Sequence, residues 1–164
     1  MATLVELVDV DALFKYDAAL DGSQQEFREI YASPKLRNWI ETTLPALVSS
    51  WNIELSPAEQ LDALGAIFAA GEPLTFGRQF KPLTHIHDGV WELKTADLRI
   101  FGWFYRKDCF VGVVADETSN VKAHGLYRGY AGEVLRFRDQ LTLKAPKFLP
   151  GDQPNDVVSD WNYP

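Results

Sequence analysis

Four basic side chains are placed within the most apolar stretch of the sequence, residues 89–116. They are Lys94, Arg99, Arg106 and Lys107. Such residues either keep a surface soluble or bind an anion. An arginine suits a phosphate because its guanidinium is planar, always charged and rich in hydrogen-bond donors. The alternative for Arg99 is an ion pair with a nearby carboxylate such as Glu92.

A histidine pair precedes this stretch in the segment "THIHDG". On a strand, His85 and His87 would point the same way, with Asp88 next to them. Imidazole nitrogens and a carboxylate suit zinc or another transition metal. Spacing fixes no third ligand, although His124 could approach in space. A polar segment before a turn explains the same residues without a metal, so we expect no metal site.

The single cysteine, Cys109, limits the chemistry that is available to the chain. It excludes an internal disulfide and any metal site built from cysteines. Because no base lies beside it in the sequence, we expect Cys109 to be a small buried or edge residue. The sequence has no glycine-rich phosphate loop, nucleophile elbow or paired-carboxylate motif. We therefore expect no cofactor.

Charge is distributed unevenly along the chain. The net charge of −7 argues against a nucleic-acid partner, because such partners are held largely through phosphate contacts. However, residues 1–74 hold 4 basic and 12 acidic side chains, whereas residues 75–140 hold 10 and 8. This asymmetry is compatible with an RNA site in the second range.

Length and composition indicate one domain. The 164 residues, 46% of them hydrophobic, suffice for one ordinary core. There is no run of about eighteen apolar residues and no basic region leading into an apolar segment. We therefore expect a cytoplasmic protein that has no membrane partner.

The first half of the chain contains signals for three helices and a strand. A capping box at Ser23 and Glu26 predicts a helix that continues to Tyr31, and a second helical pattern covers residues 36–47. The alternating segment 50–55 predicts a strand. Ser56, Pro57 and Glu59 then predict the start of a third helix, which ends before Gly71.

The second half predicts a three-stranded meander followed by a helix. Strands are expected at 90–94, 98–104 and 110–115, a polar loop at 116–125, and a helix from Leu126 to Leu141. The proline-rich tail from Ala145 is expected to be extended. These elements predict an α+β fold, in which a small twisted, mainly antiparallel sheet is packed by helices. We expect an acidic, helical N-terminal extension at 1–49, a core at 50–141 and an extended tail at 142–164, in one compact domain overall.

Part of this pattern is similar to a known group of proteins. The segments "FKPL", "GVWELKTADLRIFGWF" and "DCFVGVVAD" resemble the RelE/HigB superfamily of small bacterial toxins, especially its phage-derived branch. In that group, a Leu-Trp-Glu-Leu-type strand precedes a strand in which an arginine opens an apolar run. A third strand and a C-terminal helix follow. The resemblance covers roughly residues 50–141.

The resemblance implies ribosome-associated cleavage of mRNA, in which the RNA 2′-hydroxyl attacks the adjacent phosphate without a metal. Such a site needs cations that hold the phosphate and a group that moves a proton. Arg99 matches the strand arginine of the family, and a histidine suits proton transfer near neutral pH. The expected site residues are Arg99, Lys94, Lys122, His124 and Tyr127.

Three functions stay open at this point. The first is a toxin that acts on mRNA and the ribosome and is neutralised by an antitoxin; the acidic range 1–49 could also cover its basic face. The second is a non-catalytic phage or mobile-element protein that binds a host protein through its acidic surface. The third is a metal hydrolase that uses His85.

Overall fold

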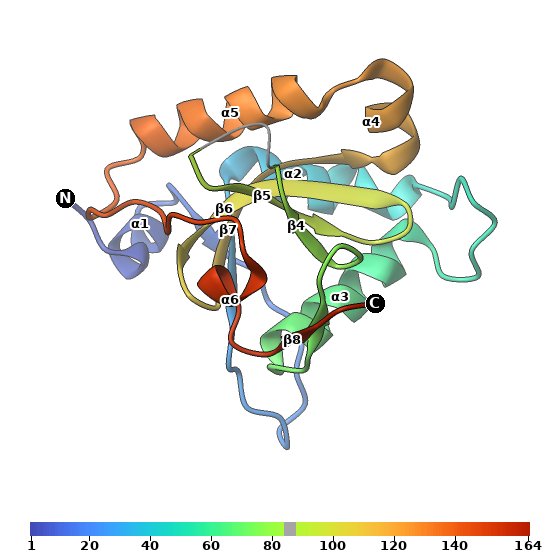
Figure 1. Ribbon diagram of the computed structural model, residues 1–164, viewed down its shortest axis with the longest axis horizontal. Coiled ribbons are helices and arrows are strands. Elements are labelled where there is room, and N and C mark those ends of the chain that lie inside the picture. Colours follow the sequence, from blue (N-terminus) through green and yellow to red (C-terminus); the bar gives the residue numbers. More distant parts are fainter. Residues whose placement is uncertain (84–87) are drawn as a thin grey trace.

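The computed structural model describes residues 1–83 and 88–164 and shows an α+β fold built on a six-stranded sheet (Figure 1). The strand order is β1-β2-β7-β6-β5-β4. β2 runs parallel to β7 and every other neighbouring pair is antiparallel, so the sheet is mixed but mainly antiparallel. The strands of this sheet are β1 (Phe14–Lys15), β2 (Glu29–Ala32), β4 (Phe80–Pro82), β5 (Val90–Lys94), β6 (Leu98–Arg106) and β7 (Cys109–Glu117). A separate parallel pair joins β3 (Leu74–Thr75) to β8 (Trp161–Asn162).

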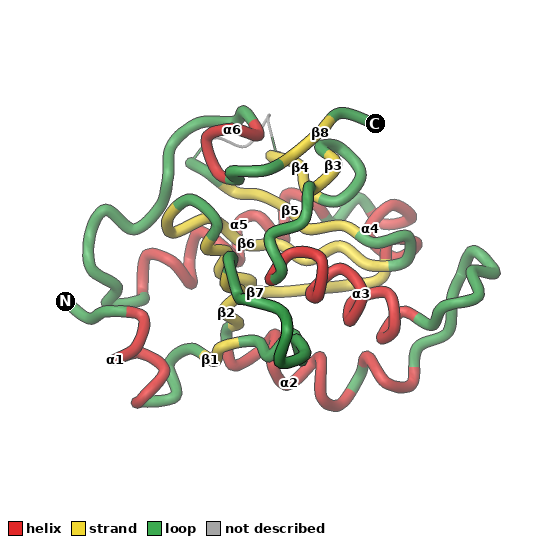
Figure 2. Tube along the Cα trace, turned by 90° about the horizontal axis from the view of Figure 1, so that it is seen from below, coloured by secondary structure: helices red, strands yellow, loops and turns green. Residues whose placement is uncertain are grey.

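Helices cover both faces of the sheet. In Figure 1 the α5 helix lies above the sheet and α3 lies below it, and Figure 2 shows α2 and α3 from that lower side. The helices are α1 (Leu4–Asp9), α2 (Pro34–Thr42), the short 3₁₀ helix η1 (Leu44–Ala46), α3 (Pro57–Ala69), α4 (Thr118–His124), α5 (Tyr127–Gln140) and α6 (Pro154–Val157).

The meander separates two hydrophobic cores by simple alternation. Val90, Phe101 and Trp103 belong to the core beneath α1, α4 and α5. Trp91 and Leu93 point to the opposite face and belong to the core against α2 and α3. Because successive strand residues face opposite sides, two apolar layers need a continuous apolar run, and β5 to β7 provide it.

Local signals predicted several elements correctly. The three strands of the meander, α2 and α5 form where they are expected. The α3 helix begins with a complete capping box, because the Ser56 side chain accepts from Glu59 N–H and the Glu59 side chain accepts from Ser56 N–H. Pro57 occupies its first turn, where a missing N–H is harmless.

The predicted helix at 23–31 is wrong. Ser23 N–H donates to Asp21 Oδ1 at 2.8 Å, which forms a local turn instead of a helix cap. Residues Glu29–Ala32 form β2, which is paired with β7. Pairing with a strand about eighty positions away overrides the local pattern, which short-range signals cannot reveal.

Two further predictions are also wrong. The segment 50–55 is not a strand: Ser49 Oγ accepts from the N–H groups of Trp51 and Ile53, and this folds the segment into turns. The expected loop at 116–125 contains α4, which ends at Gly125 in the left-handed conformation. The tail is only partly extended, since it contains the helix α6 before the strand β8.

The N-terminal range 1–49 contributes to the same sheet as the meander. It contains β1 and β2, which extend the sheet beyond β7, in addition to the helices α1 and α2. Leu4 and Leu7 of α1 are buried in the core beneath α5. The acidic range therefore lies partly at the sheet edge opposite to β4.

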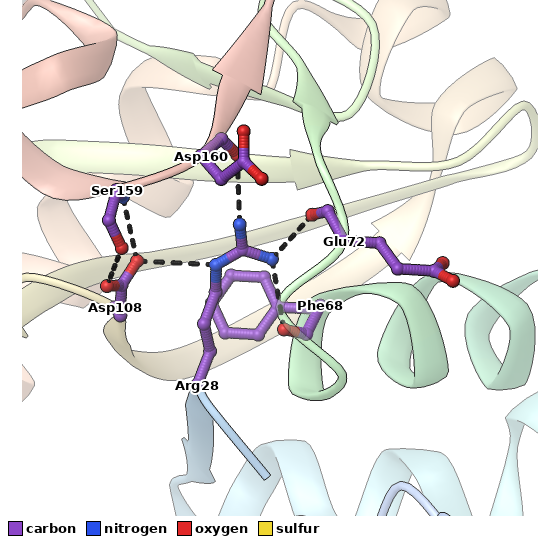
Figure 3. A network of polar contacts seen from close by, with 6 residues as sticks. All are labelled: Arg28, Phe68, Glu72, Asp108, Ser159 and Asp160. Carbon is purple, nitrogen blue, oxygen red and sulfur yellow. Dashed lines mark hydrogen bonds and ion pairs between the residues drawn. The ribbon is translucent and has the colours of Figure 1, made fainter. Parts of the chain in front are cut away.

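Arg28 joins four separate segments of the chain (Figure 3). Its guanidinium donates to the carbonyl oxygens of Phe68, Glu72 and Asp160 at 3.1, 2.8 and 2.9 Å, and it lies 3.3 Å from Asp108 Oδ1. Asp108 also accepts from Ser159 N–H at 2.9 Å. The Arg28 side chain is 2% exposed. This buried cation therefore holds the end of α3, the β6–β7 turn and the C-terminal segment to β2.

Candidate functional site

A hollow of about 330 Å³ lies at the β4 side of the sheet, on the face that α4 and α5 cover. It is formed by β4, β5 and β6 together with one residue from α4 and one from the start of α5. The lining residues are Lys81, Pro82, Leu83, Glu92, Lys94, Arg99, Lys122 and Tyr127. Four cations and one carboxyl group therefore surround a single small space.

Strand register brings these side chains together. Lys81 on β4 is paired with Glu92 on β5, and Lys94 on β5 is paired with Arg99 on β6. Residues two apart on a strand share a face, so Glu92 and Lys94 project to the same side. Phe101, paired with Glu92, contacts Tyr127 edge to face with ring centroids 5.8 Å apart. This contact fixes Tyr127 at the wall of the hollow.

Arg99 is held by backbone oxygens at the end of the β5–β6 hairpin. Its side chain donates to Thr95 O at 2.7 Å and to Leu98 O at 2.9 Å, and the residue is only 7% exposed. Within residues 1–83 and 88–164, Arg99 forms no ion pair with a carboxylate, and its buried Nε atom has no hydrogen-bond partner. The guanidinium is thus fixed in place while its charge has no direct counter-ion.

Glu92 is the buried acid of the hollow. The residue is 2% exposed, and its Oε2 atom has no hydrogen-bond partner in the described part of the chain. Burial raises the pKa of Glu92, while the nearby charges of Arg99 and Lys94 act in the opposite direction. A carboxyl group with a raised pKa can accept and release a proton closer to neutral pH.

The pKa of Lys94 is shifted in the direction opposite to that of Glu92. Burial lowers the pKa of Lys94, the neighbouring charge of Arg99 lowers it further, and Glu92 partly offsets both. Its ammonium group donates to Gly77 O at 2.7 Å. Burial therefore moves the pKa of Glu92 up and that of Lys94 down, the directions in which enzymes tune a carboxyl and an amine for proton transfer near neutral pH.

A second, more open hollow of about 510 Å³ adjoins the first. Its lining residues are Leu55, Gln60, Ala63, Leu64, Ile67, Gly77, Arg78, Gln79, Lys94, Thr95, Ala96 and Arg99. Lys94 and Arg99 line both hollows. We call the first the Glu92 hollow and the second the Arg78 hollow. Neither lining includes a residue from 1–49, so this range does not cover the basic hollows.

The structure brings together four of the five site residues that the sequence predicts. Arg99, Lys94, Lys122 and Tyr127 line the Glu92 hollow. His124 does not line it; this residue is exposed in the last turn of α4. The position of His124 follows from the helix that replaces the expected loop.

Sequence reasoning missed Lys81 and Glu92. A usable signal was present for Glu92, because it alternates with Val90 and Lys94 and so lies on the same face as Lys94. Finding Lys81 requires the pairing of β4 with β5, which the sequence does not specify. These two residues add a fourth cation and the only carboxyl group of the site.

The possible metal site is only partly described. His85 and His87 lie outside the described residues, and Asp88 accepts a hydrogen bond from Arg138 through its backbone oxygen at 2.6 Å. Elsewhere in the described chain, no group of three or more His, Cys, Asp or Glu residues could hold a metal ion. Cys109 is buried, and burial raises the pKa of its thiol to about 12. The thiol is therefore protonated and unreactive near neutral pH.

Two further findings concern the chain as a whole: the length of its described helices and the comparison with known proteins. No helix in the part of the chain that the structure describes is long and apolar enough to cross a membrane. The longest of them, α5, has 14 residues. No family model, curated protein or solved structure matches the chain.

Proposed function

We propose that this protein is a RelE/HigB-like toxin, an endoribonuclease that cleaves ribosome-bound mRNA without a metal ion. One observation carries the proposal: four cations surround a buried carboxyl group in the Glu92 hollow. The order of the meander strands and the following helix supports the RelE-like assignment of the fold. Arg99 also lies at the position that the resemblance assigns to the strand arginine.

The proposed reaction is an internal transfer of the phosphoryl group. The 2′-oxygen of the RNA forms a bond to the adjacent phosphorus, and the bond from phosphorus to the 5′-oxygen of the next nucleotide breaks. One proton leaves the 2′-hydroxyl and another is added to the departing 5′-oxygen. The products carry a 2′,3′-cyclic phosphate and a 5′-hydroxyl, and negative charge grows on the phosphate oxygens in between.

Each side chain has a role that suits its chemistry. Arg99, Lys81 and Lys122 bind the phosphate oxygens, where fixed positive charge stabilises the transition state. Glu92 accepts the proton of the 2′-hydroxyl, since its raised pKa makes it a better base than an exposed carboxylate. Lys94 protonates the departing oxygen, since its lowered pKa makes it a better acid than an exposed lysine.

The distribution of charge supports an encounter with RNA in spite of the net charge of −7. The cations of the site come from residues 78–122, in the part of the chain with a basic excess. β1 and β2, from the acidic part, occupy the opposite edge of the sheet from β4. A phosphate backbone can therefore approach the β4 edge without meeting those two strands.

Inducible expression with a translation readout tests this function. We expect the wild-type protein to arrest translation and to leave cyclic phosphate ends on mRNA. Arg99→Gln should reduce cleavage by about 10²–10³-fold, since it removes a charge that acts on the transition state. Lys122 is exposed, so Lys122→Gln should weaken cleavage without any effect on folding. Arg136→Gln, which changes an exposed arginine outside both hollows, is the matched control. Intact mRNA and normal translation with the wild-type protein would refute the proposal.

A second candidate function is that of a non-catalytic phage or mobile-element protein that binds a host protein. It is favoured by the segment 48–55, in which Val48, Trp51, Ile53 and Leu55 are 79%, 52%, 42% and 44% exposed. Large exposed apolar side chains within one short segment are typical of protein-binding surfaces. If this candidate is correct, Trp51→Asp abolishes a stable complex with the host protein, and Arg99→Gln leaves that complex intact.

A further inference from the structure

The Arg78 hollow has two walls of different chemistry. Leu55 and the α3 residues Ala63 and Ile67 provide an apolar wall, while Arg78, Lys94 and Arg99 contribute positive charge. A nucleotide combines the same two properties, because it has a flat base and an anionic phosphate. A positively charged groove with an apolar surface for bases is how proteins hold single-stranded nucleic acid.

The Arg78 hollow can bind an anion but lacks a general base, and its proton donor Lys94 is shared with the Glu92 hollow. No aspartate, glutamate or histidine is among the residues that line it, whereas Glu92 lies at the floor of the neighbouring hollow. The two spaces therefore differ in what they can do with a phosphodiester. The proposed phosphoryl transfer takes place in the Glu92 hollow. The Arg78 hollow positions a part of the ligand that does not react.

Arg78 lies in a turn that is held by several hydrogen bonds. Gly77 has φ +87°, a conformation that favours glycine, and its N–H donates to Phe80 O at 2.9 Å. Gln79 Oε1 accepts from Thr75 N–H at 2.7 Å, and Lys94 N–H donates to Gln79 O at 2.8 Å. Arg78 itself is exposed and forms no ion pair with another residue of the described ranges. Its charge is therefore available to a ligand.

Two cations contribute to both hollows. Lys94 and Arg99 line both spaces, so the Glu92 hollow on the α5 side of the sheet and the Arg78 hollow on the α3 side meet at the end of the β5–β6 hairpin. Consecutive phosphates of one strand satisfy this arrangement, whereas a single phosphate occupies only one hollow. The net charge of −7 makes five cations at one edge of the molecule a local feature that overall composition does not explain.

We propose that the Arg78 hollow is a second nucleotide subsite, which binds the nucleotide next to the reacting phosphate. Arg78 contacts the flanking phosphate, and the flanking base lies against the wall of Leu55, Ala63 and Ile67. This base must be unpaired in order to reach the wall, so the ligand is a single strand. The proposal rests on the proposed ribonuclease function for the identity of the ligand.

Binding of an RNA that cannot be cleaved tests the subsite directly. The probe is a fluorescent single strand of about twelve 2′-O-methyl nucleotides, a length within the range that single-strand sites cover. One lost phosphate contact lowers the salt slope by about 0.7, which corresponds to about fivefold weaker binding at roughly 0.1 M salt relative to 1 M. We expect this loss for Arg78→Gln and no change for the control Arg136→Gln. The dinucleotide UpU has a single phosphate and so no flanking phosphate for Arg78, and it should bind both variants equally.

The outcomes separate the subsite from the nuclease. Equal binding of the long probe by Arg78→Gln and Arg136→Gln would overturn the subsite, and so would equal affinity for the single strand and a duplex of the same length. If the wild-type protein leaves ribosome-bound mRNA intact but Arg78→Gln still weakens binding of the long probe, the subsite stands and the nuclease function fails. If binding of UpU is unchanged while cleavage of ribosome-bound mRNA falls in Arg78→Gln, both proposals are supported.

Discussion

Lys94 and Arg99 face each other directly on β5 and β6, so that two positive charges form one cross-strand pair. Like charges in this position destabilise a sheet. Their ammonium and guanidinium groups are instead held by backbone oxygens, those of Gly77 for Lys94 and of Thr95 and Leu98 for Arg99. Under the proposed function, the phosphate of the RNA is the counter-ion of this pair.

Removing one of these two charges should stabilise the free protein. In Lys94→Gln, the amide group can still donate to Gly77 O, while the repulsion with Arg99 is lost. We expect the free energy of unfolding to rise by about 0.5 kcal/mol, within the range for cross-strand pairs. RNA binding should weaken at the same time. Urea denaturation and a binding titration measure the two effects, and a less stable variant would argue against the repulsion.

The same lysine gives stability a dependence on alkaline pH. The pKa of Lys94 is lower in the folded protein than in the unfolded chain, because burial and Arg99 disfavour the charged form. Between the folded value and the ordinary value of about 10.5, the unfolded chain binds more protons. Stability from this group therefore rises with pH across that window. Lys94→Gln should lack this rise, and denaturation at several pH values measures the difference.

Glu92→Gln should remove a pH dependence of the opposite sign. Burial raises the pKa of Glu92 in the folded protein, so the folded state binds more protons above the ordinary value of about 4.3. The stabilising contribution is complete below that value and is lost as pH rises through the folded pKa. Because glutamine stays neutral, we expect the variant to be more stable than wild type by about 1–2 kcal/mol at pH 7. The two proteins should converge below about pH 4.

Urea denaturation of both proteins from about pH 4 to pH 8 measures this difference. Cleavage activity should fall in the same variant, because the amide group cannot accept the 2′-hydroxyl proton. A stability difference that is constant over the whole range would show that the pKa of Glu92 is the same in the folded and unfolded states. In that case a role of Glu92 in proton transfer near neutral pH would lose its support.

Local patterns predicted the parts of the fold that depend on neighbours in the sequence. Alternation predicted β5 and β6, and the Ser56 capping box predicted the start of α3. The capping pattern at Ser23 failed because β2 gains more from pairing with β7, which lies far away in the chain. A parallel pair of this kind leaves little trace in the sequence of either strand.

The site residues also divide into those set by sequence neighbours and those set by distant segments. Arg99 and Lys94 were expected from the resemblance, and they meet because both belong to one hairpin with a short turn. Lys81 joins them only through the β4–β5 pairing, and His124 is turned away by a helix that the sequence did not indicate. Glu92 was visible in the sequence as a charged residue between Trp91 and Leu93. Its burial, which gives it chemical interest, depends on the surrounding elements.

Arg28→Met tests the cation that holds the C-terminal segment to the rest of the fold. The Arg28 side chain is 2% exposed, and its guanidinium donates to three carbonyl oxygens and contacts Asp108. Removing one partner of a buried charge pair leaves the other groups without partners, and typical losses are about 3–5 kcal/mol. We expect a loss of this size in the free energy of unfolding, measured by urea denaturation, and release of the segment that follows residue 158, measured by hydrogen exchange.

Arg37→Met is the matched control for this prediction. Arg37 is also paired with a carboxylate, that of Glu41 at 3.1 Å, and it lies over the ring of Phe14. Its side chain is 49% exposed, so the pair is screened by water and its loss should change stability by less than about 1 kcal/mol. Equal losses of unfolding free energy in the two variants would mean that burial of the Arg28 network adds nothing to stability. If Arg28→Met instead leaves exchange after residue 158 unchanged, the contacts of β8 with β3 hold the tail without Arg28.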